Sequence, residues 1–483
     1  MNKLPATLQL PNRMVYLPVA LSFVREMSHL VELSQAQRQD LEVACDEAIS
    51  NVIRHAYPDS EEAHFEVRCE FLPRGLQVAI CDRGIPLDPQ NAPEGMGSML
   101  MRAMVSQVCY VNLGARGKEV RLLTTTNEQR VSEPEHPPEH PHDRQSPGEL
   151  ITRPMQPQEA VQVSRCFFEA YGYSYVYEDV YYPERMAALQ ATSQIYSAVA
   201  VSARQEVVSH MALRFSHLLP GVAEVAMAAT RPRYQGNKVI SSLESLLMAE
   251  CLRLNLSGVF SNAVTVHPYS QRGLLKNGFR ICGFLLAHSL ETTKFTDLSD
   301  SRKERGSVAI CYLQLSKPRS FKAFPPASCR ELVQRIYEHL QLPMELADEA
   351  AVVRDSSAFR LKSEVHLTLH SERAVASLDL QRYGQDIDER LREALFHCKR
   401  HHMKVVEALL NLADPYTPVL AELLEREGFR LTGIVPGVTG GDRMVMQYFN
   451  GIAADYQSVK IEDPFAKELL AAIQASDPLG GFA

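Results

Sequence analysis

The sequence predicts an α/β protein in which an N-terminal α/β sandwich precedes two tandem domains built on mixed sheets. Three observations predict this fold class. Strand-like apolar runs alternate with stretches of helical periodicity, a Pro-rich segment interrupts them, and one series of motifs occurs twice. With 483 residues the chain has room for about three domains. Its composition, 45% hydrophobic and 22% charged, is that of an ordinary globular protein.

The Pro-rich segment sets the first domain boundary. Residues 127–149 contain five prolines and few apolar residues, so we expect an extended linker there. A second group of prolines, Pro318, Pro325 and Pro326, follows a strand-like run and marks a further boundary. The expected domains are residues 1–126, 150–317 and 318–455, followed by a tail of residues 456–483 with one helix at residues 464–475.

The second and third blocks share an order of motifs that indicates an internal duplication. In each block a loop rich in Arg, Tyr and Gly is followed by a helix, a strand, a Pro-Tyr-hydroxyl step and a Gly-Phe-Arg step. A glycine then lies three residues after the arginine, at Gly283 or Gly433. The matched motifs are Arg233-Tyr234-Gln235-Gly236 with Arg382-Tyr383-Gly384-Gln385, Pro268-Tyr269-Ser270 with Pro415-Tyr416-Thr417, and Gly278-Phe279-Arg280 with Gly428-Phe429-Arg430.

Charge and apolar content exclude several function classes. A net charge of −8, from 50 basic and 58 acidic residues, argues against a nucleic-acid partner. The chain has neither an apolar run near the roughly 20 residues of a membrane helix nor an N-terminal signal sequence. We therefore expect a cytoplasmic protein that does not bind membranes. Ten cysteines without a Cys-x-x-Cys pair are expected to be reduced and buried.

The first block contains a helix with two polar residues on one face. Ser34 and Gln37 form a capping box, and the run from Gln35 to Ala56 keeps an apolar stripe. Glu47 and Asn51 lie four residues apart, so their side chains emerge about one turn from each other. A carboxylate and an amide placed in this way can serve as a base and as an oxygen ligand for Mg²⁺.

Two further motifs follow this helix. A hairpin predicted over residues 65–81 delivers Asp82-Arg83-Gly84-Ile85-Pro86 at a strand end, where a carboxylate can accept a hydrogen bond from an adenine amino group. Glu94-Gly95-Met96-Gly97-Ser98 then opens a helix expected at residues 99–105. Its glycines leave backbone N–H groups at the helix N-terminus for phosphate.

Taken in this order, the motifs resemble the GHKL ATPase fold in the form found in bacterial anti-sigma-factor serine kinases. The resemblance spans residues 8–124. It implies that Asn51 coordinates Mg²⁺, that Glu47 is the candidate base for a protein hydroxyl or a water, and that Asp82 reads the adenine of ATP. The glycines that would shape the pocket are Gly84, Gly95 and Gly97.

The second block contains a strand, a glycine-bearing loop and a helix in succession. The strand ends near Thr230, residues 231–238 form the loop, and a helix is expected at residues 239–254. Backbone N–H groups and the helix dipole then point at one spot, which suits a pyrophosphate. A further strand at residues 259–266 leads to a short helix that begins at His267-Pro268-Tyr269.

This order resembles the GNAT family of N-acyltransferases over residues 150–316. The family's Arg/Gln-x-x-Gly-x-Gly/Ala loop is matched by Arg233-x-x-Gly236-x-Lys238, with Lys in place of the last small residue. The resemblance implies that the strand edge of residues 226–229 aligns the pantetheine arm of acetyl-CoA or another acyl-CoA. The residues it assigns to CoA binding are Ala228, Arg233, Tyr234, Gln235, Gly236, Asn237 and Lys238.

The acid and base of the transfer are less well defined. Leu274 occupies the position of the family's tyrosine that protonates the thiolate, so either Tyr269 or His267 would replace it. Glu224, on the strand before the loop, is the base candidate. In the third block, Asp386 and Asp388 put negative charge where the pyrophosphate would lie. That block is therefore expected to be a degenerate GNAT-like half without CoA, with strands at residues 355–369 and 443–449.

The expected function is that of a bacterial cytoplasmic regulator in which an ATP-binding, anti-sigma-kinase-like domain is joined to an acyl-CoA-dependent N-acyltransferase. One alternative is a partner-switching serine/threonine kinase or anti-sigma-type regulator whose GNAT half only senses acyl-CoA. Another is a scaffold with neither activity. Expected ligands are ATP, Mg²⁺ and acetyl-CoA. The protein partner would be an anti-sigma antagonist, a sigma factor or an acylated protein, and a homodimer stays open.

Overall fold

We describe a computed structural model of the chain. It divides into two compact units, one of Met1–Ala191, Val199–His210 and Ala229–Val239, the other of Thr192–Ala198, Met211–Ala228 and Ile240–Ala483. These limits differ from the expected domain boundaries, which stay predictions. The described residues are 5–31, 33–57, 63–72, 75–86, 96–125, 150–173, 175–235, 239–289, 305–353, 361–371 and 373–477.

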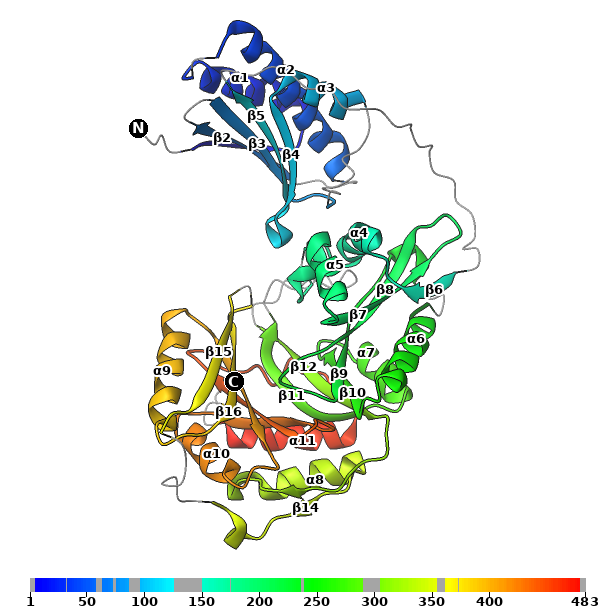
Figure 1. Ribbon diagram of the computed structural model, residues 1–483, viewed down its shortest axis with the longest axis vertical. Coiled ribbons are helices and arrows are strands. Elements are labelled where there is room, and N and C mark those ends of the chain that lie inside the picture. Colours follow the sequence, from blue (N-terminus) through cyan, green and yellow to red (C-terminus); the bar gives the residue numbers. More distant parts are fainter. Residues whose placement is uncertain are drawn as a thin grey trace. The chain divides into compact units, whose positions relative to one another are not determined.

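The N-terminal part of the chain is an antiparallel sheet with helices packed on one of its faces (Figure 1). The strand order is β1-β2-β3-β5-β4. The expected α/β sandwich is therefore confirmed. The strands are β1 (Ala6–Pro11), β2 (His64–Leu72), β3 (Gly75–Asp82), β4 (Gln107–Asn112) and β5 (Lys118–Thr125), and the helices are α1 (Leu17–Ser28), α2 (Gln35–Asn51) and α3 (Met96–Met104).

Helix α2 forms where the capping box and the apolar stripe predicted it. Ser34 Oγ accepts from the Gln37 N–H, and Gln37 Oε1 accepts from the Ser34 N–H. The stripe faces the sheet, with Leu41, Cys45 and Ile49 fully buried. The helix is shorter than the predicted run to Ala56, because the chain changes at Val52 to a π-helical turn, η2 (Val52–Ala56).

The rest of the chain contributes to a twelve-stranded mixed sheet of order β15-β16-β17-β19-β18-β11-β12-β10-β9-β8-β7-β6. Its strands are β6 (Ile151–Pro154), β7 (Ile195–Val201), β8 (Val207–Arg214), β9 (Val222–Thr230), β10 (Gly258–Val264), β11 (Arg280–Ser289), β12 (Gly306–Gln314), β15 (Glu364–His370), β16 (Val375–Arg382), β17 (Val405–Asn411), β18 (Arg430–Val435) and β19 (Arg443–Phe449). A separate short pair is β13 (Lys322–Ala323) with β14 (Glu345–Leu346).

Helices are interspersed with these strands. They are α4 (Ala160–Tyr171), α5 (Pro183–Ala191), α6 (Val239–Arg253), α7 (Tyr269–Lys276), α8 (Arg330–Leu340), α9 (Ile387–Arg400), α10 (Thr417–Arg426) and α11 (Pro464–Ser476). The chain order β9-α6-β10-α7-β11-β12 recurs as β16-α9-β17-α10-β18-β19, and the sheet orders β9-β10-β12-β11 and β16-β17-β19-β18 are the same. Two tandem mixed-sheet halves, as expected, are therefore present.

The two halves meet edge to edge at β11 and β18. Gly283 pairs with Gly433 across an antiparallel contact, and a Cβ on Gly283 would lie 2.5 Å from the Cα of Gly433. Only glycine allows the two backbones to approach this closely. The two glycines matched in the sequence repeat thus occupy the contact point between the halves.

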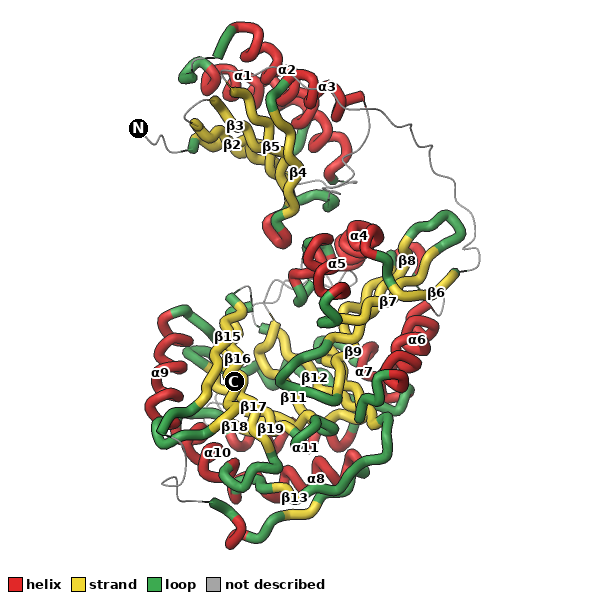
Figure 2. Tube along the Cα trace, in the orientation of Figure 1, coloured by secondary structure: helices red, strands yellow, loops and turns green. Residues whose placement is uncertain are grey.

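The C-terminal segment packs over this contact. Helix α11 touches β11, β18 and α8, and α8 and α11 lie beside each other (Figure 2). Before the helix, the Lys460 N–H donates to the Thr265 carbonyl at 2.7 Å, and Gln271 Nε2 donates to the Lys460 carbonyl at 3.0 Å. The tail helix, expected at residues 464–475, is confirmed.

One predicted strand begins later than expected. The run of residues 355–369 was expected to be extended, but β15 begins at Glu364. The Ser363 N–H donates to Asp386 Oδ1 at 2.5 Å, so this residue is held by a side chain and lies outside the strand ladder. Residues 354–360 lie outside the described residues.

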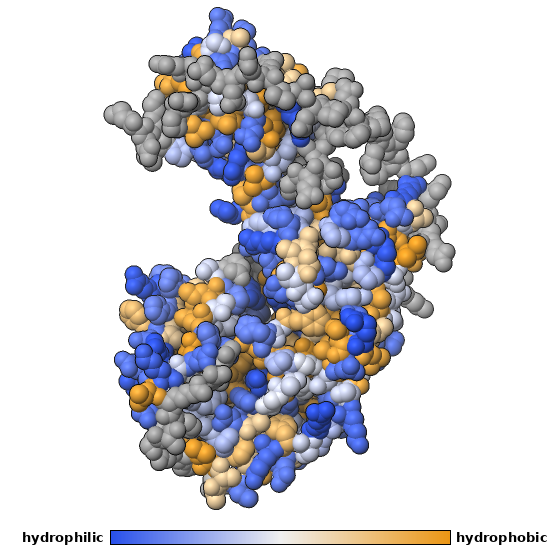
Figure 3. Space-filling model, viewed as in Figure 1, coloured by the Kyte–Doolittle hydropathy of each residue, from blue (hydrophilic) through white to orange (hydrophobic). Residues whose placement is uncertain are grey.

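In the described part of the chain, every helix is too short or too polar to cross a membrane. Figure 3 shows hydrophilic and hydrophobic residues interspersed over the face in view.

Candidate functional sites

Glu47 and Asn51 lie together on α2, as their spacing predicts. Asn51 Nδ2 donates to Glu47 Oε1 at 3.0 Å. The π-helical turn begins directly after Asn51, and such turns interrupt helices frequently at functional sites. His55, within that turn, is exposed.

Gly97, at the start of α3, lies against this pair. A Cβ at Gly97 would overlap the Glu47 carboxylate, so any side chain at this position would displace Glu47 from its place beside Asn51. The structure thus brings the predicted phosphate-loop glycine into contact with the predicted base. Gly95 lies outside the described residues.

Asp82 lies at the end of β3 with 4% of its surface exposed. Its Oδ1 accepts from the Gly84 N–H at 2.8 Å and from Lys118 Nζ at 2.5 Å. Its Oδ2 is buried and has no hydrogen-bond partner within the described residues. Burying such an acceptor without a donor costs about 1–3 kcal/mol, and the amino group of adenine would supply the donor.

Gly84 reaches this position because its backbone runs close to the end of η2. A Cβ there would overlap the Ala56 carbonyl, and the Ile85 N–H donates to the same carbonyl at 2.9 Å. Glu47, Asn51 and Asp82 are thus held on elements that are tied to each other by backbone contacts.

Lys118 is a site residue that the sequence reasoning missed. It begins β5 directly opposite Asp82 in the antiparallel register and is 4% exposed. Burial lowers the pKa of its ammonium group, and the ion pair with Asp82 opposes that change. Lys118 directly follows Gly117 at the start of a strand, and this local sequence gave no usable signal, because the partner of the lysine depends on strand register.

The second candidate site begins where β9 and β10 separate. These parallel strands pair only between Val222–Glu224 and Gly258–Phe260. Met227, farther along β9, has a φ of 53°, which is rare for a side chain of this kind. Ser261 Oγ reaches across to the Val225 carbonyl at 2.9 Å. Past this point, no backbone pairs join these two described strands.

Glu224 lies at the point of divergence and is 7% exposed. It accepts from Arg214 Nη1 and from Asn262 Nδ2, each at 2.9 Å. Both carboxylate oxygens are therefore engaged, and the proposed base is held in a fixed orientation. Ala228 lies on the same strand, four residues later.

His267 and Tyr269 lie at the start of α7, with ring centroids 5.0 Å apart. Tyr269 is 69% exposed, whereas Gln271 anchors the helix start through Nε2, which donates to the Val264 and Lys460 carbonyls. The structure therefore brings the two alternative acids together and does not choose between them.

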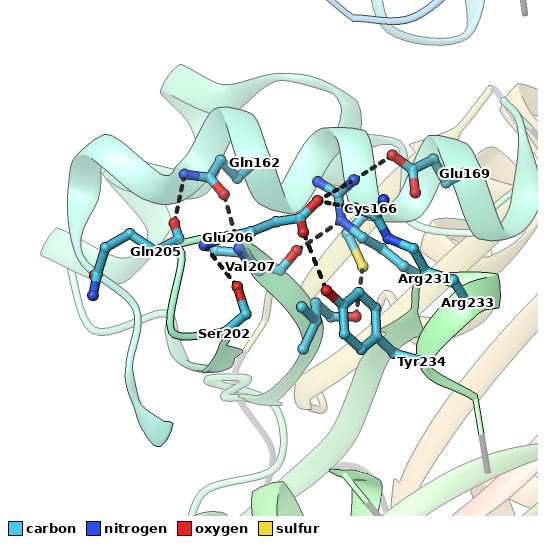
Figure 4. Close-up of polar contacts among 11 residues, drawn as sticks. Gln162, Cys166, Glu169, Ser202, Gln205, Glu206, Val207, Arg231, Arg233 and Tyr234 are labelled. Carbon is cyan, nitrogen blue, oxygen red and sulfur yellow. Dashed lines mark hydrogen bonds and ion pairs between the residues drawn. The ribbon is translucent and has the colours of Figure 1, made fainter. Parts of the chain in front are cut away.

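The loop after β9 is described as far as Gln235, and the predicted Gly236, Asn237 and Lys238 lie outside the described residues. In the described part, Arg231, Arg233 and Tyr234 converge on Glu206 (Figure 4). Glu206 lies in the turn between β7 and β8, a position with no sequence signal. Its role as a shared acceptor appears only in three dimensions.

The third block differs from the second in two places, the pair of parallel strands and the segment that leads into the next helix. Strands β16 and β17 pair over five residues, from Val375↔Val405 to Asp379↔Leu409, so they stay together for longer. Asp386 precedes α9 and binds the Ser363 N–H, and Asp388 pairs with Arg392 at 2.7 Å.

The model for the family described as histidine kinase-like ATPase domain matches residues 10–124. This segment contains the Glu47–Asn51 pair, Asp82 and Gly97. The first domain is a histidine kinase-like ATPase domain. The match covers less than half of the chain, and the ATPase domain is the part that it describes.

Solved structures resemble other parts of the chain only distantly. One is the ribosomal-protein-S18-alanine N-acetyltransferase from Escherichia coli, with 11% identity, 35% of this chain and 97% of that chain covered, and a TM-score of 0.29. Another is the PaiA N-acetyltransferase from Thermoplasma acidophilum in complex with coenzyme A, with 12% identity, 35% and 100% coverage, and a TM-score of 0.26. At such scores neither likeness supports an activity.

Comparison with curated proteins found no match. Within the described residues, no group of three or more His, Cys, Asp or Glu side chains is arranged to hold a metal ion.

Proposed function

We propose that the protein is a bacterial cytoplasmic regulator in which an acyl-CoA-dependent N-acyltransferase is coupled to ATP binding by the ATPase domain. The observation that carries the transferase part is the divergence of β9 from β10 directly after Glu224, next to the left-handed Met227. A residue held in such a conformation costs about 1–3 kcal/mol, and strain of this kind is concentrated at binding and catalytic sites.

The divergence suits an extended amide-bearing arm. Pantetheine carries two amides, and a strand that has lost its neighbour offers it backbone partners along residues 226–229, including Ala228. The thioester would then lie near Glu224, which would take the proton of the attacking amine. Tyr269 or His267 would return a proton to the leaving thiolate. Holding the amine and the thioester together in the right orientation would provide most of the rate acceleration.

In the ATPase domain, the buried Asp82 Oδ2 supports adenine recognition. Asn51 would bind Mg²⁺, and Gly97 would bring the phosphates close to Glu47. Bound Mg²⁺ would neutralise part of the phosphate charge. Binding of ATP to one site and of acyl-CoA to the other is proposed to be energetically coupled.

The transferase part is tested by release of CoA from acetyl-CoA with a panel of amines and N-terminal peptides. The full-length protein should release CoA with at least one acceptor. Gly236→Asp puts a negative charge in the loop of residues 231–238, where the pyrophosphate of CoA would bind, and should abolish release. Gly451→Asp is the matched control, since a Cβ at Gly451 meets nothing within 4 Å and its φ of 67° lies in the left-handed region that aspartate adopts more readily than most residues. Failure of every acceptor would refute the transferase.

The coupling is tested by thermal unfolding with ATP·Mg²⁺ and acetyl-CoA, separately and together. Each ligand should raise the midpoint alone, and together they should give a shift that is not the sum of the two. Asp82→Asn should remove the ATP response and leave the acetyl-CoA response. Additive shifts would show two independent sites.

A second candidate is a partner-switching serine/threonine kinase or anti-sigma-type regulator in which the acyltransferase half only senses acyl-CoA. The hydrogen bond between Asn51 and Glu47 beneath Gly97 favours it, because it sets a base beside a metal ligand. This candidate predicts transfer of phosphate from ATP to a Ser or Thr of a protein partner, lost in Asn51→Ala.

A further inference from the structure

Glu206 is the shared acceptor for the side chains that open the proposed phosphate loop. It lies 3.2 Å from Arg231 Nη1, forms an ion pair with Arg233 Nη2, and accepts from the Tyr234 hydroxyl at 3.4 Å (Figure 4). The side chains of three loop residues thus meet at one carboxylate.

The turn that carries Glu206 is fixed by its own hydrogen bonds. The Ser202 N–H donates to the Glu206 carbonyl at 2.9 Å, and the Glu206 N–H donates to Ser202 Oγ at 3.3 Å. Gln162 on α4 clamps the same turn, because it donates to the Gln205 carbonyl at 3.3 Å and accepts from the Val207 N–H at 2.8 Å. The carboxylate is therefore presented from a rigid support.

The two arginines differ in their surroundings. Arg231 is 6% exposed, donates through Nε to the Val207 carbonyl at 2.8 Å and pairs with Glu169, so it is built into the fold. The side chain of Arg233 is 51% exposed. Arg233 is thus the cation that can exchange Glu206 for a ligand without unpacking the protein.

The charged groups around Glu206 balance one another. Two arginines face the two carboxylates of Glu169 and Glu206, so the formal charges of this cluster cancel. The phosphates of an acyl-CoA are anions of the same kind as the Glu206 carboxylate. They would compete with it for the same donors.

We propose that Glu206 is an internal competitor for the phosphate groups of acyl-CoA. Its carboxylate holds Arg233 and Tyr234 in the unliganded protein and is displaced when a phosphate binds them. This inference rests on the proposed acyl-CoA site. When acyl-CoA binds, one of its phosphates then replaces the Glu206 carboxylate. This exchange weakens the affinity for acyl-CoA, so the fraction of protein with ligand bound follows the concentration of acyl-CoA.

The test is Glu206→Gln in the full-length protein, titrated with CoA in a calorimeter. The amide keeps the size of the side chain and removes its charge. CoA should bind roughly two- to fivefold more tightly, the scale of a partly exposed ion pair, and with a steeper dependence on salt. Glu169→Gln is the matched control, since among the described residues Glu169 pairs with Arg231 and not with Arg233, and should change the Kd by less than about twofold.

A double variant shows whether the effect passes through Arg233. Arg233→Gln should weaken CoA binding, and adding Glu206→Gln to it should restore nothing. Titration with dephospho-CoA, which lacks the 3′-phosphate, identifies the phosphate group that Arg233 binds. If Glu206→Gln tightens the binding of CoA but not of dephospho-CoA, Arg233 binds the 3′-phosphate, and if it tightens the binding of both, Arg233 binds the pyrophosphate. Either result supports the proposal.

Two outcomes would overturn it. If wild type binds CoA and Glu206→Gln binds it equally or more weakly, Glu206 orders the loop and does not compete. If neither protein binds CoA while both keep the same unfolding midpoint, the acyl-CoA site itself is wrong. Should Glu206→Gln fold poorly, Glu206→Asp withdraws the carboxylate from Arg233 and must likewise tighten binding.

Discussion

The two oxygens of the Asp82 carboxylate have different surroundings. Oδ1 is held by Lys118 and by the Gly84 N–H, whereas Oδ2 is buried and faces no donor among the described residues. The hydrogen bond from Lys118 fixes the rotation of the carboxylate and leaves Oδ2 as the oxygen without a donor among the described residues. Lys118 is a positioning residue, because its own contact is with Asp82 and its effect on ATP passes through that side chain.

Replacing Lys118 by Met should destabilise the protein by about 3–5 kcal/mol, because a buried carboxylate then loses its charge partner. It should also weaken ATP binding. Urea unfolding and ATP titration measure the two effects. Asp82→Asn in the Lys118→Met background should recover part of the stability, since the uncompensated charge is gone. If Lys118→Met lowers the stability by the same amount with and without Asp82→Asn, the two side chains do not stabilise each other.

Gly97→Ala should weaken ATP binding at least roughly tenfold, equivalent to about 1.4 kcal/mol. The added methyl group overlaps the Glu47 carboxylate, so the Glu47 side chain must leave its position beside Asn51. Met99→Ala, on the exposed side of the same helix, is the control and should bind ATP as wild type does. Titration with ATP·Mg²⁺ compares them, and unchanged binding in Gly97→Ala would show that the ATP phosphates do not lie against Gly97.

At this scale the sequence predicted residues that belong to contiguous motifs. Glu47 and Asn51 could be paired because helical spacing alone places them together. Lys118 and Glu206 could not be found, because one depends on the register of β3 with β5 and the other on the packing of a turn against a loop. Neither relation is local in the chain.

At the scale of elements, α11 holds a histidine of α8 away from water. The His339 ring stacks on Phe465, with centroids 4.0 Å apart and planes 10° apart. Burial lowers the pKa of His339 below its ordinary value. The unfolded chain therefore binds a proton more readily than the folded one, and this part of the stability falls as pH drops through about 6.5.

His339→Leu should remove that pH dependence. Between about pH 7.5 and 5.5, wild type should lose more stability than the variant, because only wild type has this half-buried imidazole to protonate on unfolding. The midpoint of urea unfolding at each pH gives the comparison. His366→Gln, whose side chain is 59% exposed in wild type, should keep the wild-type slope. An unchanged slope in His339→Leu would rule out the histidine as its source.

Elements with strong local signals were predicted closely. The capping box fixed the start of α2, the residues of β19 coincide with the expected run, and α11 extends one residue beyond it. The π-helical turn after Asn51 was not predicted, because its residues keep the apolar pattern of an α-helix. The delayed start of β15 depends on the distant Asp386 and has no local signal.

At the scale of the whole molecule, the duplication was readable because matching motifs kept their order. What the sequence did not show is how the halves join, since the contact of Gly283 with Gly433 is a pairing between copies.

Gly283→Ala should destabilise the chain by about 1–3 kcal/mol, because its methyl group meets the Gly433 backbone and has nowhere to move. Gly273→Ala is the matched control. A Cβ there meets nothing within 4 Å in α7, so the change should be neutral or stabilise by about 0.4–1 kcal/mol. Urea unfolding distinguishes them, and equal stability of both variants would contradict the tight contact.

The contact between β11 and β18 also decides how this sheet responds to dilution. A sheet continued between separate chains comes apart as their concentration falls, because its formation is bimolecular. Here the second edge is supplied by the same polypeptide, so its effective concentration is set by the connecting chain and not by abundance. A protein of this kind present in few copies would keep its sheet whole where a dimer built on the same edge would dissociate.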